Sequence, residues 1–136
     1  MRGLSTRNIL RRKRMALETY NCEICSMLVE ETVDHLFWHC PFAQLCWGLL
    51  NLNIIQTEGI FENVMAIKDQ MQSQFFMVAV ILMSWTICRA RDELIFNNNQ
   101  VGIQECKNYF LKEAKLVSLR VKTSLSAIYD QWIQRL

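Results

Sequence analysis

Residues 22–40 read CEICSMLVEETVDHLFWHC, a stretch that is rich in metal-binding residue types and has no regular apolar pattern. Two residues separate the two cysteines of the C-x2-C pair, nine more precede the first histidine, and four more precede the last cysteine. A C-x2-C turn lets two thiolates converge on one ion, and three thiolates with one imidazole suit a closed, tetrahedral zinc site. Because the stretch has too few apolar side chains to fold unaided, we expect one Zn2+ to order it. The predicted ligands are Cys22, Cys25, His35 and Cys40.

Other interpretations of this stretch stay open at the level of sequence. His39 can compete with Cys40 as the fourth ligand, although the central spacing of a Cys2His2 finger is usually about twelve residues and here is nine. The cysteines can instead be buried as small apolar residues, or Cys22 and Cys25 can form a redox pair, which would lack its usual βαβ context. A catalytic zinc needs a coordination position left to water, and four ligands leave none. We therefore expect a structural metal site and no catalytic residues.

Charge is distributed unevenly along the 136 residues, although the whole chain carries only +2. Residues 1–21 have a net charge of +5, residues 22–70 of −6 and residues 71–136 of +3. The basic arm at residues 1–21 contains four consecutive cations, at residues 11–14. Such a run can contact phosphate, an acidic protein surface, a nuclear-import receptor or water alone. We expect this basic arm to bind RNA or DNA weakly, with a solvated helix face as the alternative. The residues assigned to that binding are Arg7, Arg11, Arg12, Lys13 and Arg14.

Apolar spacing and the scarcity of glycine, four residues in all, predict a mainly α fold. We expect a zinc-binding module with a basic N-terminal helix over residues 1–52, and a helical region over residues 60–136 that packs with it. The almost wholly apolar residues 75–88 would span about 21 Å as a helix, short of the roughly 30 Å hydrocarbon core. A buried central helix is therefore predicted, and no membrane association. Helices are expected over residues 6–15, 41–51, 61–96 with a break near 70–74, and 103–132. The second of these is expected to have one apolar face, formed by Phe42, Leu45, Cys46, Leu49 and Leu50.

The last predicted helix carries an apolar stripe with an average spacing of 3.6 residues, which is typical of one long amphipathic helix. This stripe needs a partner surface, either the helix at residues 75–88 or another chain, including a second copy. Cys46, Cys88 and Cys106 occupy apolar positions of helical patterns, where we expect core packing. We also expect the thiols to be reduced in an intracellular protein, with the nucleus favoured over the cytoplasm. The stripe comprises Ile103, Cys106, Phe110, Ala114, Val117, Val121, Leu125, Ile128 and Trp132.

Several stretches together resemble the reverse-transcriptase zinc-binding domain. They are LSTRNILRR at residues 4–12, Cys22-x2-Cys25, ETVDHLFWHC at residues 31–40, Ala43 and Trp47. This family lies near the C-terminus of plant non-LTR (LINE-type) retrotransposon polyproteins and also occurs as isolated open reading frames. The resemblance covers about residues 4–50, and WTICRARDELIFNN at residues 85–98 is similar to a stretch that commonly follows the zinc motif. Cys88 and Asp92 stand there in place of the usual Trp and Asn.

The resemblance implies zinc on the four predicted ligands, with Leu36, Phe37 and Trp47 in the core of the module, and nucleic-acid binding in the parent element. The family's opening aromatic-rich segment is missing, which we interpret as an N-terminally truncated copy. The sequence has no Tyr-x-Asp-Asp polymerase motif and no spaced carboxylates for two Mg2+ ions. We expect a non-enzymatic zinc-binding protein derived from a retrotransposon. The alternatives are a helical protein-interaction module with purely structural zinc, or a relic without selected function.

Overall fold

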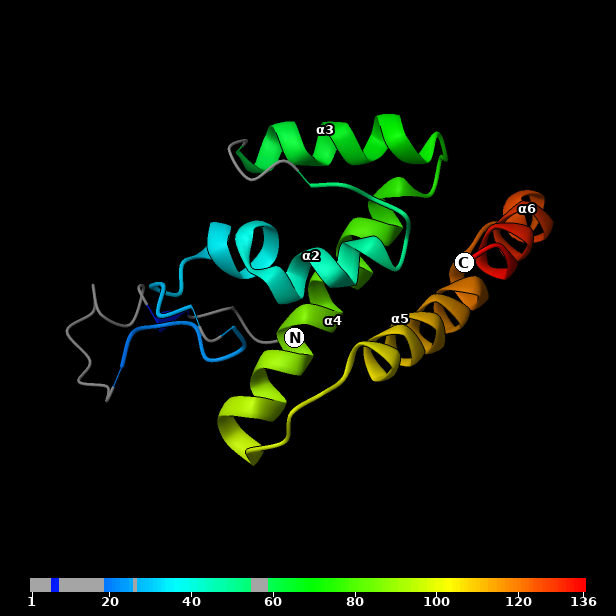
Figure 1. The fold of residues 1–136 in the computed structure, drawn as a ribbon. Coiled ribbons are helices and arrows are strands. Elements are labelled where there is room, and N and C mark those ends of the chain that lie inside the picture. Colours follow the sequence, from blue (N-terminus) through cyan, green and yellow to red (C-terminus); the bar gives the residue numbers. More distant parts are fainter. Residues whose placement is uncertain (1–5, 8–18, 26, 55–58) are drawn as a thin grey trace.

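The computed structural model describes residues 6–7, 19–25, 27–54 and 59–136. Over these residues the chain is mainly α-helical, which confirms the expected fold class (Figure 1). The helix expected over residues 6–15 lies outside the described residues except for Thr6 and Arg7. The elements in chain order are the π-helical turn η1 (His35–His39), α2 (Pro41–Gly48), α3 (Ile60–Met71), α4 (Phe76–Asn97), α5 (Ile103–Val117), the 3-10 turn η2 (Ser118–Arg120) and α6 (Thr123–Gln134).

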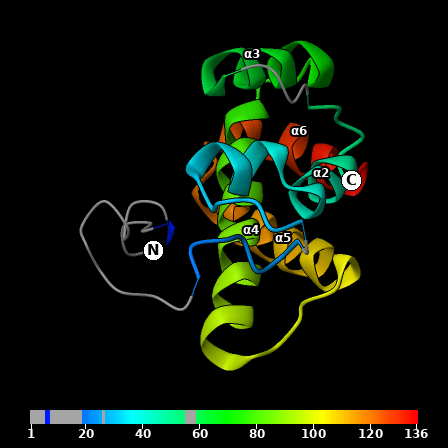
Figure 2. The same cartoon turned by 60° about the vertical axis from the view of Figure 1, so that its left-hand side comes forward.

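The long helix α4 runs through the centre of the fold and contacts η1, α2, α3 and α5 (Figures 1 and 2). Ala79, Met83 and Ile87 recur every four residues on its inner face and are completely buried. The buried central helix predicted from residues 75–88 is therefore confirmed. Within the described part of the chain, no helix has the length and apolar character needed to cross a membrane.

The expected interruption of the helical pattern near residues 70–74 is also confirmed, because α3 ends at Met71 and α4 begins at Phe76. Gln72 adopts a left-handed conformation with φ 49°, and its N–H donates to the carbonyl of Lys68 at 3.1 Å. This bond satisfies one of the carbonyls that the end of a helix leaves free. The turn lets α3 lie across the beginning of α4 (Figure 1).

The helix that begins at Pro41, α2, is shorter than expected, and its buried face is rotated relative to the predicted one. It ends at Gly48 rather than Asn51, and Leu45, predicted to face inward, is 59% exposed. Cys46 and Leu50 are buried as predicted, and Ala43 and Trp47 are buried with them. The indole of Trp47 determines this rotation: it is completely buried, stacks on Trp38 with ring centroids 5.2 Å apart, and donates from Nε1 to the carbonyl of Phe37 at 2.8 Å.

The prediction of a single long helix over residues 103–132 is wrong. The α-helix ends at Val117, and the chain then forms a helical hairpin. Val121 is extended, with ψ 140°, and α6 folds back so that Tyr129 donates from its hydroxyl to the carbonyl of Ala114 at 2.6 Å. This return buries Tyr129 completely, whereas Ile128 of the predicted stripe is 49% exposed. A straight helix would leave the second half of its apolar face in water, which the hairpin avoids.

The first half of the predicted stripe packs inside the chain itself. Cys106, Phe110 and Ala114 of α5 are buried, and α4 and α5 form the most extensive helix pair of the described residues. The partner expected on the helix at residues 75–88 is therefore confirmed for this half, while docking of another chain stays a prediction. Cys46 and Cys88 are buried as well, as expected.

Candidate metal centre

The C-x2-C pair lies in a turn between two short extended segments that pair through their backbones. The N–H of Cys22 donates to the carbonyl of Val29 at 2.8 Å, and the N–H of Glu31 donates to the carbonyl of Tyr20 at 2.9 Å. These two bonds close a small hairpin from Tyr20 to Glu31. Cys22 and Cys25 lie in it, and both are buried.

The other two predicted ligands are brought together by the turn η1. The N–H of His35 donates to the hydroxyl of Thr32 at 3.0 Å, which fixes the start of the turn. The N–H of Cys40 then donates to the carbonyl of His35 at 2.6 Å, so the four intervening residues form one wide helical turn. Cys40 is extended and immediately precedes Pro41, the first residue of α2. The spacing of four residues thus places the imidazole and the thiol on the same side of the backbone.

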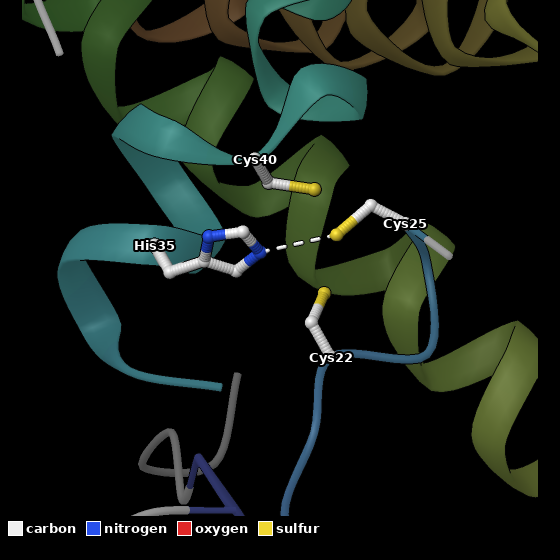
Figure 3. A group of neighbouring side chains, drawn as sticks. All are labelled: Cys22, Cys25, His35 and Cys40. Atoms are coloured by element: carbon white, nitrogen blue, oxygen red, sulfur yellow. Dashed lines mark hydrogen bonds between the residues drawn. The ribbon is translucent and has the colours of Figure 1, made fainter. Parts of the chain in front are cut away.

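The four side chains point toward one another from the hairpin, η1 and the start of α2 (Figure 3). Their ligand atoms all lie within 4.8 Å of one another, and all four residues are buried. Nε2 of His35 lies 3.2 Å from Sγ of Cys25. With zinc bonds of about 2.0–2.3 Å, a tetrahedron places neighbouring donor atoms roughly 3.5–3.8 Å apart. The cluster of Cys22, Cys25, His35 and Cys40 therefore has the size of a zinc site.

The surroundings favour the metal-binding protonation state at His35 and Cys40, and the protonated thiol at Cys22 and Cys25. Burial lowers the pKa of His35, which keeps its imidazole neutral and its ring nitrogen able to bind a cation. The hydrogen bond between Cys22 and Cys40 raises the pKa of the Cys22 thiol and lowers that of Cys40. Burial raises the pKa of Cys25. A divalent cation can take the place of the thiol protons in this group, because thiolates are the form that binds metals.

The structure groups Cys40, and not His39, with the other three residues. His39 is half-buried, and its Nε2 has no hydrogen-bond partner among the described residues. Of the two fourth ligands that the sequence left open, only the thiol lies in the cluster. Within the described ranges, no other group of three or more His, Cys, Asp or Glu residues has this geometry.

Sequence reasoning missed a buried ion pair that joins the hairpin to α4. Glu31 is completely buried, and Arg91 of α4 donates to its carboxylate from Nη2 at 2.8 Å and from Nε at 3.0 Å. The backbone N–H of Arg7 donates to the same carboxylate at 2.8 Å. A signal was present, because Arg91 follows Ile87 by four residues on the inner face of α4, where a cation requires a buried partner.

Of the five residues predicted to bind nucleic acid, Arg7 alone lies among the described residues. Its guanidinium donates to Glu23 at 2.6 Å and to the carbonyl of Thr19 at 2.7 Å, and the residue is 9% exposed. These bonds hold Arg7 against the hairpin and leave its guanidinium engaged within the chain. Arg11, Arg12, Lys13 and Arg14 lie outside the described residues.

Comparison with known proteins identifies the class of this segment. Residues 1–47 match the family described as zinc-binding in reverse transcriptase, a match that includes all four residues of the cluster. The resemblance to the reverse-transcriptase zinc-binding domain is thereby confirmed over 47 of the 136 residues. No curated protein and no solved structure matches the chain significantly.

Proposed function

We propose that the chain binds one structural Zn2+ through Cys22, Cys25, His35 and Cys40. The observation that carries this proposal is the convergence of four buried ligand atoms within 4.8 Å of one another, in the segment that matches a zinc-binding family. Three thiolates and one imidazole select zinc over Mg2+ or Ca2+, which prefer oxygen ligands. Four protein ligands fill a tetrahedral site, so the ion holds the hairpin, η1 and α2 together and activates no water.

Elemental analysis of the purified chain tests this proposal. We expect one zinc per chain in the wild type, loss of tight binding in Cys40→Ser, and retention in His39→Ala. Cys88→Ser is the matched control, because Cys88 is also a buried cysteine but lies outside the cluster. Zinc retained by Cys40→Ser and lost from His39→Ala would assign the fourth ligand to His39. A metal-free wild type, purified in reducing buffer with zinc supplied, would refute the site.

We further propose that the protein is not an enzyme, and that it derives from a plant LINE-type retrotransposon polyprotein and binds RNA or DNA weakly. The four consecutive cations at residues 11–14 supply the charge for contacts with phosphates. Arg7 does not contribute to this contact, because it is buried and its guanidinium is bonded to Glu23 and to the Thr19 carbonyl, so the proposal depends on residues 11–14. The contact is electrostatic, so we expect no sequence preference and a steep loss of affinity with salt.

A titration of zinc-loaded protein with a fluorescent RNA or single-stranded DNA at low salt tests the arm. Replacing Arg11, Arg12, Lys13 and Arg14 together by alanine should weaken binding severely. The matched control changes the three arginines to lysine, which keeps the charge and should keep most of the affinity. Equal affinity of the wild type and the alanine variant would refute binding through the arm.

A further inference from the structure

The guanidinium of Arg89 lies against two aromatic rings that come from different helices. Its central carbon is 5.4 Å from the ring centroid of Trp85, one turn earlier in α4, and 4.2 Å from that of Tyr109 in α5. Arg89 is exposed and both rings are half-buried. No carboxylate in the described part of the chain forms an ion pair with Arg89. Three planar groups are thus fixed next to one another at the surface where α4 and α5 meet.

This arrangement continues along both helices. Ile81 precedes Trp85 by one turn on α4 and is 61% exposed. On α5, Lys112 follows Tyr109 by three residues and is exposed, so the two lie on one helix face. Residues 103–122 carry a net charge of +3, and their two acids, Glu105 and Glu113, each lie four residues from Tyr109 on the same helix face. The contact between Arg89 and Tyr109 joins the two faces into one aromatic and basic surface, called here the α4–α5 platform: Ile81, Trp85, Arg89, Tyr109 and Lys112.

We propose that the α4–α5 platform binds single-stranded nucleic acid, with unpaired bases on the aromatic and guanidinium groups and a phosphate on Lys112. The proposal extends the nucleic-acid binding proposed above to a surface outside residues 1–47. Aromatic rings and arginine planes are the groups on which bases of single strands stack, and their rigidity lowers the entropy cost of binding. Arg89 and Lys112 are the two exposed cations of the platform that can contact phosphates. Duplexes keep their bases stacked internally and therefore bind this surface more weakly.

Titrations of the zinc-loaded 136-residue chain with three probes test the platform. Short oligodeoxythymidine, oligouridine and a duplex of equal length are the probes, and fluorescence anisotropy gives the affinity. Arg89→Ala, Trp85→Leu and Tyr109→Leu, each with the basic arm intact, should weaken single-strand binding at least about fivefold, the effect of losing one stacking contact. Arg89→Lys keeps the charge but loses the planar group, and it should also weaken binding. Thermal melts must show that each variant remains folded.

A second pair of side chains provides the matched control. Lys68 of α3 lies 5.7 Å from the ring centroid of Phe76, a cation–π contact of the same kind away from the platform. Lys68→Ala should leave oligonucleotide binding unchanged. Single strands should also quench tryptophan fluorescence in the wild type but not in Trp85→Phe, a signal that the charge of the arm cannot produce. Quenching that depends on Trp85 therefore distinguishes binding at the platform from binding at residues 11–14.

Three outcomes would overturn the proposal. Affinity that falls in the arm variant but is unchanged in all folded platform variants would leave binding to the arm alone. Equal affinity for duplex and single strands, with no quenching that depends on Trp85, would exclude base stacking. Concentration-dependent dimerisation in sedimentation experiments, abolished by Ile81→Ser, without any oligonucleotide binding, would identify the platform as an interface between copies of the chain.

Discussion

Glu31 shows at the scale of one residue how the metal module is joined to the helices. Its carboxylate is completely buried and accepts three hydrogen bonds, two from Arg91 and one from the backbone of Arg7. A buried carboxylate is tolerated only when its charge and its oxygen atoms have partners. Glu31 follows Glu30 of the hairpin bridge and precedes Thr32, which begins the turn to His35. The ion pair therefore fixes the hairpin that carries two of the proposed ligands against α4.

Removing one member of this pair should destabilise the protein strongly. Arg91→Met leaves the buried charge of Glu31 without its main partner, which should lower the free energy of unfolding by about 3–5 kcal/mol. Asp92→Asn is the control: Asp92 also contacts Arg91, at 3.1 Å, but its side chain is 51% exposed, so the change should be less than about 1 kcal/mol. Chemical denaturation of the zinc-loaded variants measures both values. A smaller effect for Arg91→Met than for Asp92→Asn would contradict this account of the ion pair.

The thiol of Cys88 should be unreactive in the folded protein. Burial raises its pKa to about 11 and the residue is 2% exposed, so at neutral pH the thiol is protonated and shielded. Folding favours the protonated form, so stability should fall as the pH rises from the usual thiol range toward 11. Iodoacetamide labelling at pH 7.5, followed by peptide mass spectrometry, should modify Cys88 only after denaturation. Labelling of the native protein at the rate of a free thiol peptide would show that the site opens.

At the scale of elements, the sequence predicted where helices occur better than where they turn. The break between α3 and α4 was visible because polar residues interrupt the apolar spacing near Gln70. The turn after Val117 was not, because Val121 and Leu125 continue the 3.6-residue period without interruption. The tertiary contacts of Tyr129 with Ala114 and of the Tyr129 and Trp132 rings with Phe75 show that a return is favoured. Periodicity identifies a buried face but does not identify the helix that covers it.

The helical hairpin of α5 and α6 leads to a specific prediction about α5. Ala114 is completely buried where Tyr129 returns onto the helix, whereas Leu116, two residues later, is 50% exposed. Ala114→Asp buries a charge with no partner and should cost about 3 kcal/mol or more in stability. Leu116→Asp places the same charge in water and should cost less than about 1 kcal/mol. Equal losses in urea denaturation would show that the inner and outer faces of α5 are assigned wrongly.

The four residues of the candidate metal site could be predicted from the sequence, but the turn that brings His35 and Cys40 together could not. The spacing of Cys22, Cys25, His35 and Cys40 proposed the set that the structure brings together. Choosing between His39 and Cys40 from the sequence depended on spacing and ligand softness alone. The structure adds the reason, because η1 is a wide helical turn closed by the hydrogen bond from Cys40 to His35, which places these two residues on one side. A turn of five residues is too short to show an apolar period, so its width could not be predicted from the sequence.

At the scale of the whole molecule, the described residues fall into two kinds of structure with different sources of stability. The hairpin has few backbone bonds and holds together around the four buried ligands. The helices α4, α5 and α6 bury their own apolar side chains, among them Ile87, Phe110 and Tyr129, and contribute no residue to the cluster. Contacts of α2 with α4 and α5 link the two kinds of structure. Loss of the ion should therefore unfold the hairpin and η1 before it affects the helices.

Chelation of zinc should unfold the hairpin and η1 while leaving most of the helical structure intact. Structural zinc contributes roughly 10 kcal/mol or more in small zinc peptides, far more than the hairpin can recover from its own contacts. Circular dichroism should fall only in part after addition of a chelator, and hydrogen exchange should accelerate at residues 20–40 but little in α4 and α5. Cys40→Ser should reproduce the chelated state without chelator, and adding zinc to the chelated wild type should reverse it. Exchange rates at residues 20–40 that do not change on chelation would show that the segment folds without metal, whereas complete loss of helical signal would show that the helices depend on it.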